Sequence, residues 1–531
     1  DEATKEELRA IEGNENEIKE RFYMDLEFGT AGLRGIIGAG INRMNIYVVR
    51  RATQGLANYI IKQGAANKGV AIAYDSRHMS PEFAMEAAMT LAANGIKAYK
   101  FESLRPTPEL SFAVRELGCV AGINITASHN PPEYNGYKVY WEDGAQFTPP
   151  HDKGVTEEVL AIEDLSTVKT TDEASATAAG LYQVIGQEID DKYIAQVKAQ
   201  VVNQKAIDEM QDQITIVYTP LHGTGNIPAR RILKELGFEN VYVVKEQELP
   251  DGDFPTVSYP NPEDKNAFTL ALKFAAEVDA DIVLATDPDA DRLGIYAKNE
   301  KTGEYESFTG NMSGMLILEY LLSQRKELGM LPENGAVVTT IVSGKMARAI
   351  AKEYNVALIE TLTGFKYIGE QIKFFEQNHD HEFLFGYEES YGCLEGTHAR
   401  DKDAVVAVMA LCEAAAYYKS KGITLCEQME KLYHKYGFYK ESLFFQTFPG
   451  AEGKAKIDGL MDALRNQPPK QVGPFKVTAL EDYKKSVRTD IATGETSALT
   501  LPESNVLYFE LEDGAWFCVR PSGTEPKIKY Y

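Results

Sequence analysis

One alternation of apolar and polar positions occurs three times along the chain. A short apolar run is followed by a polar or glycine-containing loop, a helical pattern and a second apolar run. The three copies cover residues 69–101, 214–244 and 336–362. Strands that alternate with helices are typical of crossover units, in which helices cover a largely parallel sheet. The pattern therefore predicts three related α/β domains with mixed or parallel sheets.

The first two copies carry clear start and stop signals. In the first, Val70–Tyr74 predicts a buried strand, Ser80–Glu82 a helix start and Gly95 a helix end. In the second, Ile214–Tyr218 predicts the strand and Gly237 the helix end. Ligands usually bind at the carboxyl ends of such strands, so the loops that follow them are the candidate sites.

Two regions depart from this pattern. Residues 470–531 contain β-rich runs separated by turn residues, which predict the hairpins of a separate C-terminal α+β domain. Residues 163–180 are polar and rich in small side chains, so we expect a surface loop there.

Composition narrows the class of protein. The formal net charge is −24, which argues against nonspecific binding to nucleic acid or to an anionic membrane. An anionic ligand would therefore need a locally basic site, which is feasible because charges are screened over about 8 Å. The five cysteines are scattered without a C-x-x-C pair, which argues against a disulfide framework or a zinc site and favours a reducing compartment.

Targeting signals do not stand out. No uninterrupted apolar run approaches 18 residues, and the acidic N-terminus does not resemble a secretory signal. We therefore expect a cytoplasmic protein. The chain begins at Asp1 rather than Met, so we expect some residues to precede it.

Three aspartates form the strongest candidate for a metal site. Asp287, Asp289 and Asp291 follow the apolar run Ile282–Ala285 at every second position, and a second strand is expected from Leu293. Alternate residues of an extended loop point the same way, so the three carboxylates can converge and would repel one another. A hard divalent cation relieves that repulsion, and oxygen ligands favour magnesium, manganese or calcium. The alternative is a plain acidic turn. An EF-hand is excluded because Arg292 and Lys298 stand where it needs Gly and Glu.

Ser128 is the candidate phosphate carrier. It follows the apolar run Val120–Ile125 and precedes a Pro-Pro turn, so we expect it on an exposed loop. Magnesium in such sites is usually also held by a phosphate oxygen, which a serine can carry. On this segment alone, a turn serine remains the alternative. Neighbouring side chains on an extended backbone point apart, so His129 need not face Ser128. Lys138, beyond an Asn-Gly turn, is a better candidate than His129 for a residue that assists Ser128.

Three further loops could bind a ligand. Residues 520–527 (RPSGTEPK) combine an arginine, small hydroxyls and a glycine amide, which suits a phosphate; the alternative is a loop that caps a following helix. Residues 383–392 place Glu388 and Ser390 on a glycine-bounded loop that suits sugar hydroxyls, or is merely a solvated acidic loop. Residues 28–35 (FGTAGLRG) surround Arg34 with glycines, which suggests close approach to an anion.

Together these segments resemble the α-D-phosphohexomutase superfamily, the phosphoglucomutase/phosphomannomutase enzymes. TASHNP, DPDADR, GYEES and RPSGTEP occur in family order across essentially the whole chain. FGTAGLRG and EESYG look most like the long bacterial phosphoglucomutases.

The resemblance implies four domains that line a central cleft. Their expected limits are residues 1–205 with the phosphoserine loop, 206–308 with the metal loop, 309–423 with the sugar loop and 424–531 with the phosphate loop. The family's last domain usually continues with at least one helix, whereas this chain ends at Tyr531, so we expect the fourth domain to be incomplete.

The resemblance also implies roles for single residues. Ser128 would carry the phosphoryl group and, as phosphoserine, hold Mg²⁺ together with the three aspartates. Further catalytic roles would fall to Arg34 and Arg292 facing the transferring phosphate, Lys138 assisting proton transfer and His129 lining the cleft. Substrate would be bound by Thr363, Gly364, Glu388, Ser390 and Lys402, and the phosphate that is not transferred by Arg520, Ser522, Gly523 and Thr524.

The implied reaction interconverts glucose 1-phosphate and glucose 6-phosphate through glucose 1,6-bisphosphate. The same chemistry on mannose or pentose phosphates is the alternative within enzymes, and a catalytically silent sugar-phosphate sensor is the alternative outside them. We expect a small phosphosugar as the partner, no nucleic acid or membrane, and a monomer or homodimer.

Overall fold

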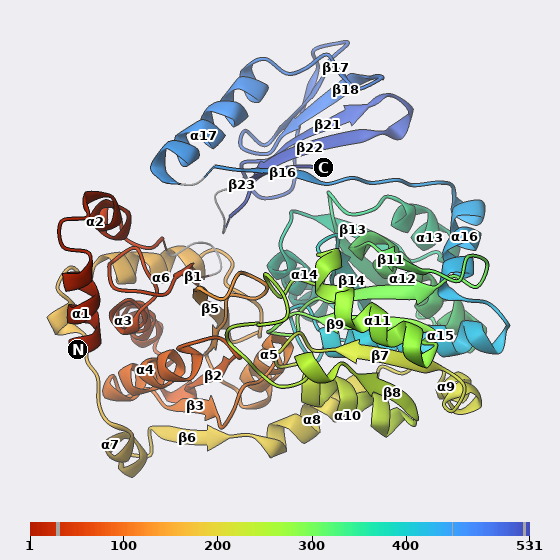
Figure 1. The fold of residues 1–531 in the computed structure, drawn as a ribbon. Coiled ribbons are helices and arrows are strands. Elements are labelled where there is room, and N and C mark those ends of the chain that lie inside the picture. Colours follow the sequence, from red (N-terminus) through yellow and green to blue (C-terminus); the bar gives the residue numbers. More distant parts are fainter. Residues whose placement is uncertain (28–31, 449, 524–526) are drawn as a thin grey trace. The chain divides into compact units, whose positions relative to one another are not determined.

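The structure is a computed structural model that describes residues 1–27, 32–448, 450–523 and 527–531 (Figure 1). It divides into two compact units. The first unit comprises Asp1–Glu360 and Gly364–Phe438, and the second comprises Thr361–Thr363 and Tyr439–Tyr531.

The N-terminal sheet of the first unit has the strand order β1-β5-β4-β2-β3-β6. The neighbouring pairs β4-β2, β2-β3 and β3-β6 are parallel, whereas β5 and β1 run antiparallel to their neighbours. The predicted strand Val70–Tyr74 is β2 and is buried along its whole length, because apolar residues fill both faces. The other strands are β1 (Gly32–Ile36), β3 (Ala98–Phe101), β4 (Ala121–Ile125), β5 (Tyr134–Trp141) and β6 (Tyr182–Ile185).

Helices accompany this sheet. Ser80 begins α4, with proline in its first turn, and the helix ends at Ala93, next to the predicted stop. The helices of this region are α1 (Glu2–Ala10), α2 (Glu15–Phe22), α3 (Ile46–Lys62), α4 (Ser80–Ala93), α5 (Thr107–Glu116), α6 (His151–Leu160), α7 (Glu173–Ala178), α8 (Gln187–Lys198) and α9 (Gln204–Met210).

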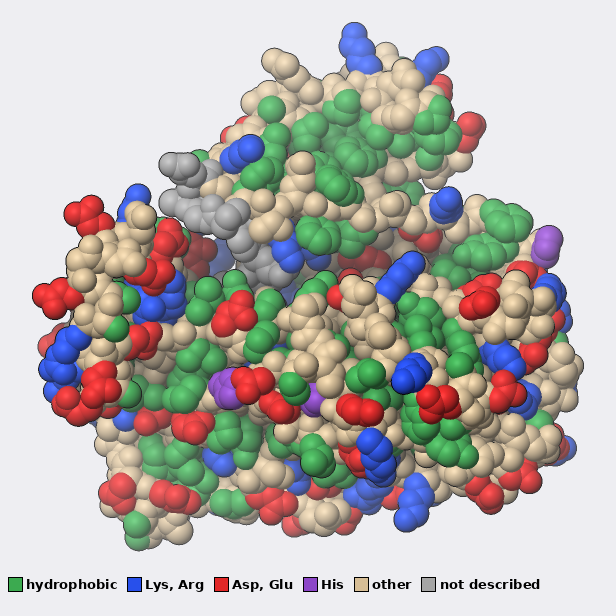
Figure 2. Space-filling model, in the orientation of Figure 1, with side chains coloured by type: hydrophobic (Ala, Val, Ile, Leu, Met, Phe, Trp, Pro, Cys, Tyr) green, Lys and Arg blue, Asp and Glu red, His purple; other side chains and the backbone are tan. Residues whose placement is uncertain are grey.

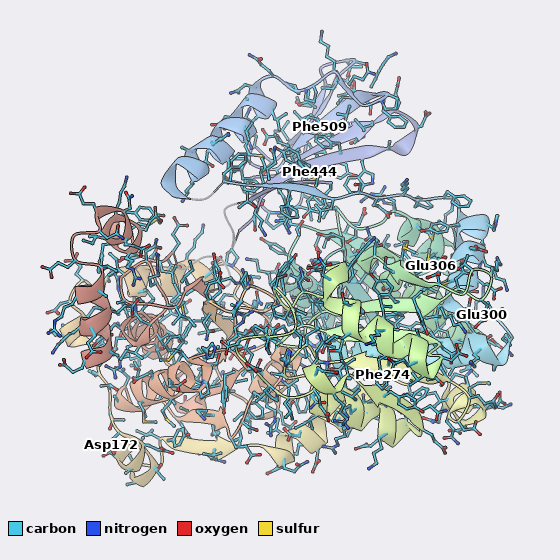
Figure 3. All side chains as sticks on the ribbon, viewed as in Figure 1. Asp172, Phe274, Glu300, Glu306, Phe444 and Phe509 are labelled. Carbon is cyan, nitrogen blue, oxygen red and sulfur yellow. The ribbon has the colours of Figure 1, made fainter. Side chains whose placement is uncertain are left out.

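The segment 163–180 corrects one sequence prediction. We expected a surface loop, but residues 173–178 form helix α7. Asp172, labelled in Figure 3, caps the helix by accepting a hydrogen bond from the Ser175 amide at 2.9 Å. Ala176 is buried, so this short helix packs against the core of the N-terminal sheet although most of its residues are exposed. The helix was missed because its segment mixes Ala, which favours helices, with Ser and Thr, which are more frequent in loops.

The second sheet has the order β11-β10-β9-β7-β8, in which β9, β7 and β8 are parallel and β10 and β11 are antiparallel. The predicted strand Ile214–Tyr218 and helix end near Gly237 match β7 and α10 within one residue. The elements are β7 (Thr215–Thr219), β8 (Asn240–Val243), β9 (Ile282–Thr286), β10 (Leu293–Lys298), β11 (Tyr305–Phe308), α10 (Asn226–Leu236) and α11 (Thr269–Val278).

The third sheet has the order β13-β12-β14-β15, with β12 and β14 parallel and β15 antiparallel. It completes the three α/β domains expected from the repeated pattern. Its elements are β12 (Gly335–Thr340), β13 (Ala357–Thr361), β14 (Glu382–Glu388), β15 (Gly392–Glu395), α12 (Gly310–Glu327), α13 (Met346–Tyr354), α14 (Phe365–Asn378), α15 (Ala404–Ser420) and α16 (Leu425–Tyr436).

The second unit contains the expected α+β domain. Its strands follow the order β16-β23-β22-β21-β18-β19-β20, with β17 beside β18, and neighbouring strands are antiparallel. Met461 of helix α17 and Phe509, labelled in Figure 3, belong to one buried cluster, so the helix covers a face of this sheet. The elements are α17 (Gly450–Asn466), β16 (Phe444–Thr447), β17 (Gln471–Val472), β18 (Phe475–Asp482), β19 (Val487–Asp490), β20 (Thr496–Ala498), β21 (Leu507–Leu511), β22 (Trp516–Pro521) and β23 (Lys527–Tyr530).

The cysteines and the surface fit the composition. All five cysteines are buried and free, and burial raises the pKa of the Cys119 and Cys426 thiols to about 12. Figure 2 shows acidic and basic side chains interspersed over the visible face, so the net negative charge does not gather in one patch there. Within the described ranges, no helix is both long and apolar enough to cross a membrane.

Candidate functional site

Ser128 lies on the loop that follows β4, at the carboxyl edge of the N-terminal sheet. Its side chain is almost fully buried, so the expected exposure of this loop residue is wrong. Its hydroxyl donates a hydrogen bond to Asp287 Oδ2 at 2.7 Å. Its amide donates to Thr126 Oγ1 at 2.8 Å. The Ser128 backbone is left-handed, with φ 51°, rather than extended. The hydroxyl lies 3.1 Å from His129 Nδ1, so His129 does face Ser128, a point that the sequence left open.

The three aspartates converge as the spacing predicts. Asp287, Asp289 and Asp291 lie on the turn between the antiparallel strands β9 and β10, and all three side chains are buried. Each offers a carboxylate oxygen, and these oxygens lie within 4.8 Å of one another. Asp287 Oδ1 also accepts hydrogen bonds from the backbone amides of Asp291 and Arg292, at 3.1 and 3.0 Å. The turn therefore holds its own first carboxylate in place.

Other segments grip the backbone of this turn. The Pro288 carbonyl accepts hydrogen bonds from the amide and the hydroxyl of Thr224, at 2.8 and 2.9 Å. The Asp289 carbonyl accepts from the Thr107 amide at 2.8 Å. A Cβ atom at Gly223 would lie 2.4 Å from Pro288 Cα, so glycine permits the close approach. The metal loop is thus held by segments from two of the α/β domains.

Two lysines reach into the carboxylate cluster. Lys138 lies on β5, which also contains the preceding Asn-Gly pair, so the turn expected there is wrong. Lys138 Nζ lies 2.7 Å from Asp289 Oδ2 and 3.5 Å from Asp291 Oδ2, and Lys402 Nζ lies 3.2 Å from Asp291 Oδ2. Burial lowers the pKa of Lys138, but the two carboxylates more than offset this, and the net pKa is raised. Burial likewise raises the pKa of Asp289, but Lys138 outweighs it, and the net pKa is lowered. Burial and the neighbouring carboxylates raise the pKa of Asp287.

The donor set fits a hard divalent cation. Among the described residues, Asp289 Oδ1 and Asp291 Oδ1 are buried carboxylate oxygens with no hydrogen-bond partner. Such oxygens are costly to bury unless a proton or a cation approaches them. An all-oxygen set of three carboxylates favours magnesium, manganese or calcium over softer metals.

Two arginines lie beside these loops. Arg34 on β1 donates from Nη1 to Asn130 Oδ1 at 2.9 Å. It therefore contacts the loop between β4 and β5 that carries Ser128, the serine loop. Arg292 follows the metal loop and donates from Nη1 to Glu263 Oε1 at 2.5 Å. Burial lowers the pKa of Arg292, but Glu263 and the metal-loop carboxylates outweigh it, so the net pKa is raised. Arginine stays protonated at neutral pH, so each loop has a cation beside it that is held by a hydrogen bond.

The sugar-loop candidates lie at the carboxyl end of β14. Glu388 is the last residue of that strand, and its Oε1 accepts a hydrogen bond from Ser390 Oγ at 2.7 Å. The Tyr391 carbonyl accepts from the Leu293 amide at 2.9 Å, which ties this loop to the first residue of β10. Gly364 precedes α14 with φ 122°, a backbone that favours glycine.

The remaining candidates belong to the second unit. Thr363 is half-buried, and its hydroxyl, among the described groups, has no hydrogen-bond partner. Arg520 on β22 donates from Nη2 to the Tyr531 hydroxyl at 2.8 Å. The Ser522 amide donates to the Lys527 carbonyl at 2.8 Å, and Gly523 is exposed. The loop joins β22 to β23, so it does not cap a helix. Thr524 lies outside the described residues.

Two buried residues that sequence reasoning missed hold the site together. Thr107 donates from Oγ1 to Asp289 Oδ2 at 2.8 Å and accepts from Asn124 Nδ2 at 2.6 Å. Arg77 donates to carbonyls of the serine loop, including that of Ser128 at 2.6 Å. Arg77 follows a predicted strand at the carboxyl edge, and that position was the available signal.

Comparisons with known proteins agree with these motifs. The chain matches the family models described as phosphoglucomutase/phosphomannomutase, alpha/beta/alpha domains I, II and III over residues 25–166, 191–302 and 309–436. It is 40% identical over 519 residues to a phosphoglucomutase of Staphylococcus epidermidis, an alignment that covers 97% of this chain and 92% of that protein. It is 38% identical over 516 residues to a phosphoglucomutase of Staphylococcus aureus, with 97% and 90% covered.

Solved structures show the same fold. A phosphoglucomutase from Paramecium, pp63/parafusin in its open form, aligns with a TM-score of 0.68 at 18% identity and covers 96% of this chain and 90% of that one. A phosphoglucomutase/phosphomannomutase family protein from Burkholderia thailandensis aligns with a TM-score of 0.65 at 18% identity, with 95% and 92% covered.

Proposed function

We propose that this chain, which belongs to the phosphoglucomutase/phosphomannomutase family, interconverts glucose 1-phosphate and glucose 6-phosphate. The observation that carries the proposal is the hydrogen bond from the Ser128 hydroxyl to Asp287, within a buried cluster of three carboxylates. Relatives named phosphoglucomutase, similar over nearly the full chain, support glucose phosphates as the substrate.

The mechanism uses Ser128 as a temporary carrier. Phospho-Ser128 transfers its phosphoryl group to the free hydroxyl of the sugar phosphate, which loses a proton as the new P–O bond forms. The resulting glucose 1,6-bisphosphate turns around, and Ser128 takes the other phosphoryl group while the released sugar oxygen regains a proton. Lys138, whose Nζ donates to Asp289 Oδ2 at 2.7 Å, would assist these proton transfers. Magnesium, held by Asp287, Asp289 and Asp291, would neutralise charge on the transferring group.

Fixed cations would supply the positive field that the acidic chain otherwise lacks. Arg34 contacts the serine loop, Arg292 follows the metal loop, and Lys402 contacts Asp291. Charges held in a buried site stabilise a transferring phosphoryl group more than solvated charges do, because they need no reorganisation. The sugar hydroxyls would be bound by Glu388 and Ser390 with Thr363 and Gly364, and the second phosphate by Arg520, Ser522, Gly523 and Thr524.

Replacing the carrier tests the proposal. We expect Ser128→Ala to lower turnover of glucose 1-phosphate by roughly 10⁴-fold or more while sugar-phosphate binding persists, because only the acceptor oxygen is lost. The matched control is Ser166→Ala, at an exposed serine of the same unit. Intact mass spectrometry after incubation with glucose 1,6-bisphosphate should find one phosphoryl group on the parent protein and none on Ser128→Ala. Parent-like turnover by the mutant contradicts the mechanism, and a parent protein that never gains phosphate favours a silent sensor.

The family description names phosphomannomutase as well, which makes mannose phosphates the second candidate substrate. Parallel kinetics with glucose 1-phosphate, mannose 1-phosphate and ribose 1-phosphate decide among these three substrates.

We also propose domain limits at residues 205, 308 and 423, a cytoplasmic location and a monomeric or homodimeric state. The buried free thiols support the location.

A further inference from the structure

The conformation of Ser128 needs support from outside its own loop. Left-handed backbone is unfavourable for a residue with a Cβ atom, and Ser128 adopts it with φ 51°. The local bond from its amide to Thr126 Oγ1 fixes one side of the turn. The Ser128 carbonyl on the other side has to find a donor elsewhere.

The Arg77 side chain supplies that donor. Its Nη2 donates to the carbonyls of Ser128 at 2.6 Å and Asn130 at 2.5 Å, and its Nη1 donates to those of Pro131 at 2.8 Å and Tyr134 at 3.0 Å. One planar guanidinium therefore holds four backbone carbonyls of the serine loop. The Arg77 side chain is fully buried, so water cannot replace these bonds.

Arg77 is itself held in place. Asp75 Oδ1 accepts hydrogen bonds from the Arg77 amide at 3.0 Å and from Ser80 Oγ at 2.9 Å, and Asp75 Oδ2 lies 3.4 Å from Arg77 Nε. The Arg77 guanidinium carbon also lies 5.1 Å from the centre of the Phe254 ring, which belongs to the region of the second sheet. Burial lowers the pKa of Arg77 to about 10, which still leaves it charged at neutral pH.

We propose that Arg77 is a positioning residue for phosphoryl transfer, which holds residues 128–134 in the one conformation that directs the Ser128 hydroxyl at Asp287. The proposal rests on the proposed function of Ser128. Arg77 does not contact the reacting oxygen; it acts through the loop backbone. Its hold extends to a second group of the site, because Asn130 accepts from Arg34 as well. A misplacement of about 1 Å in a reacting group can cost on the order of 10²-fold in rate.

Lysine cannot replace this arrangement. An ammonium group presents three donors from a single atom, whereas guanidinium presents a planar fork that spans separate acceptors. Arg77→Lys keeps the buried charge but leaves some of the four carbonyls without a donor. The Ser128 loop should then sample other conformations while the fold of the surrounding sheet survives.

The experiment compares Arg77→Lys and Asp75→Asn with Arg50→Lys. Arg50 forms a two-point ion pair with Glu86 on the same domain and does not belong to the site, so it controls for the loss of a guanidinium. The assays are steady-state kcat and KM with glucose 1-phosphate, and the rate at which glucose 1,6-bisphosphate phosphorylates Ser128, followed by intact mass. Rates are expressed per folded molecule from circular dichroism.

We expect kcat and the phosphorylation rate to fall roughly 10²-fold in Arg77→Lys and roughly 10-fold in Asp75→Asn, with KM within about twofold of the parent value. Arg50→Lys should match the parent protein. A purely structural role for Arg77 predicts a lower melting temperature with parent-like kcat per folded molecule, and that result overturns the proposal. If Arg77→Lys does not fold, a parent-like kcat in Asp75→Asn overturns it instead. Failure of the parent protein to phosphorylate at Ser128 contradicts the proposed function rather than this inference.

Discussion

The serine and metal loops of the first unit differ sharply from the phosphate loop of the second. Ser128 is 3% exposed and Asp287 and Asp289 are 0% exposed, whereas Arg520 is half-buried and Gly523 is exposed. In the first unit, the Asp287 carboxylate accepts hydrogen bonds from backbone amides and from Ser128, and the Asp289 carboxylate accepts from Lys138 and Thr107. At the described ends of the phosphate loop, the Arg520 guanidinium donates to the Tyr531 hydroxyl and the Ser522 amide donates to the Lys527 carbonyl.

This difference matches the two roles that we propose for these loops. Groups that stabilise charge during bond making benefit from burial, because a low dielectric strengthens each interaction and the groups are already oriented. A loop that only holds an unreactive phosphate needs affinity, and it must accept either end of the sugar. The first unit should therefore govern kcat and the second unit KM.

Among the changes that compare the two units, loss of one carboxylate of the metal loop should have the largest effect. Asp289→Asn removes a carboxylate charge and the partner of Lys138, so we expect kcat to fall roughly 10³-fold at saturating magnesium. Treatment of the parent protein with a chelator should abolish activity, and added Mg²⁺ should restore it. The control is Asp253→Asn, an exposed aspartate of the same unit. Chelator-resistant turnover would argue against a metal at this loop.

A change in the phosphate loop of the second unit should alter KM rather than kcat. Arg520→Ala should raise KM for glucose 1-phosphate roughly 10- to 150-fold with a much smaller change in kcat, because a charge-assisted hydrogen bond is worth about 1.5–3 kcal/mol. Arg488→Ala, which removes an ion pair with Glu510 in the same unit, is the matched control. A fall in kcat at constant KM would place Arg520 among the groups that act on the transferring phosphate.

The smallest expected effect concerns the cost of burial itself. Glu395 ends β15 with both carboxylate oxygens buried, and Arg325 Nη2 lies 3.5 Å from Glu395 Oε1. Burial outweighs the effect of Arg325 and raises the pKa of Glu395 from 4.5 to about 8. The folded state therefore holds a proton that the unfolded state loses, and stability should fall as pH rises from about 4.5 to about 8. Glu395→Gln should flatten this slope and raise the melting temperature at pH 8.

The exposed Glu382→Gln is the control for that measurement. A melting temperature of Glu395→Gln that follows the parent protein at every pH between 5 and 8 would show that Glu395 is ionised in the fold. The difference between the two units would then be tested only by the effects of Asp289→Asn and Arg520→Ala on kcat and KM.

The sequence alone predicted the elements and the local clusters well. The buried strand Val70–Tyr74 was placed to the residue, because an apolar run bounded by glycine and aspartate leaves little choice. The convergence of Asp287, Asp289 and Asp291 followed from their spacing within one turn. Both signals are local, so one segment contains all the information they need.

Contacts between distant segments could not be read in the same way. Arg77 and Ser128 are 51 positions apart, and Thr107 and Asp289 are 182 apart. Their meeting depends on how sheets and domains pack, which no local pattern encodes. The contact between Ser128 and His129 was left open by the sequence for another reason. Side-chain alternation assumes an extended backbone, whereas Ser128 is left-handed.

The buried thiols allow the two units to be observed separately. Cys119, Cys393, Cys412 and Cys426 belong to the first unit, and Cys518 belongs to the second. A buried thiol is inert towards alkylating reagents until its surroundings open, because only the exposed thiolate reacts. Each thiol that becomes exposed therefore gains one alkyl group, which intact mass can count. The first unit can gain four such groups and the second unit one. The untreated chain already carries the probes needed to time the loosening of each unit.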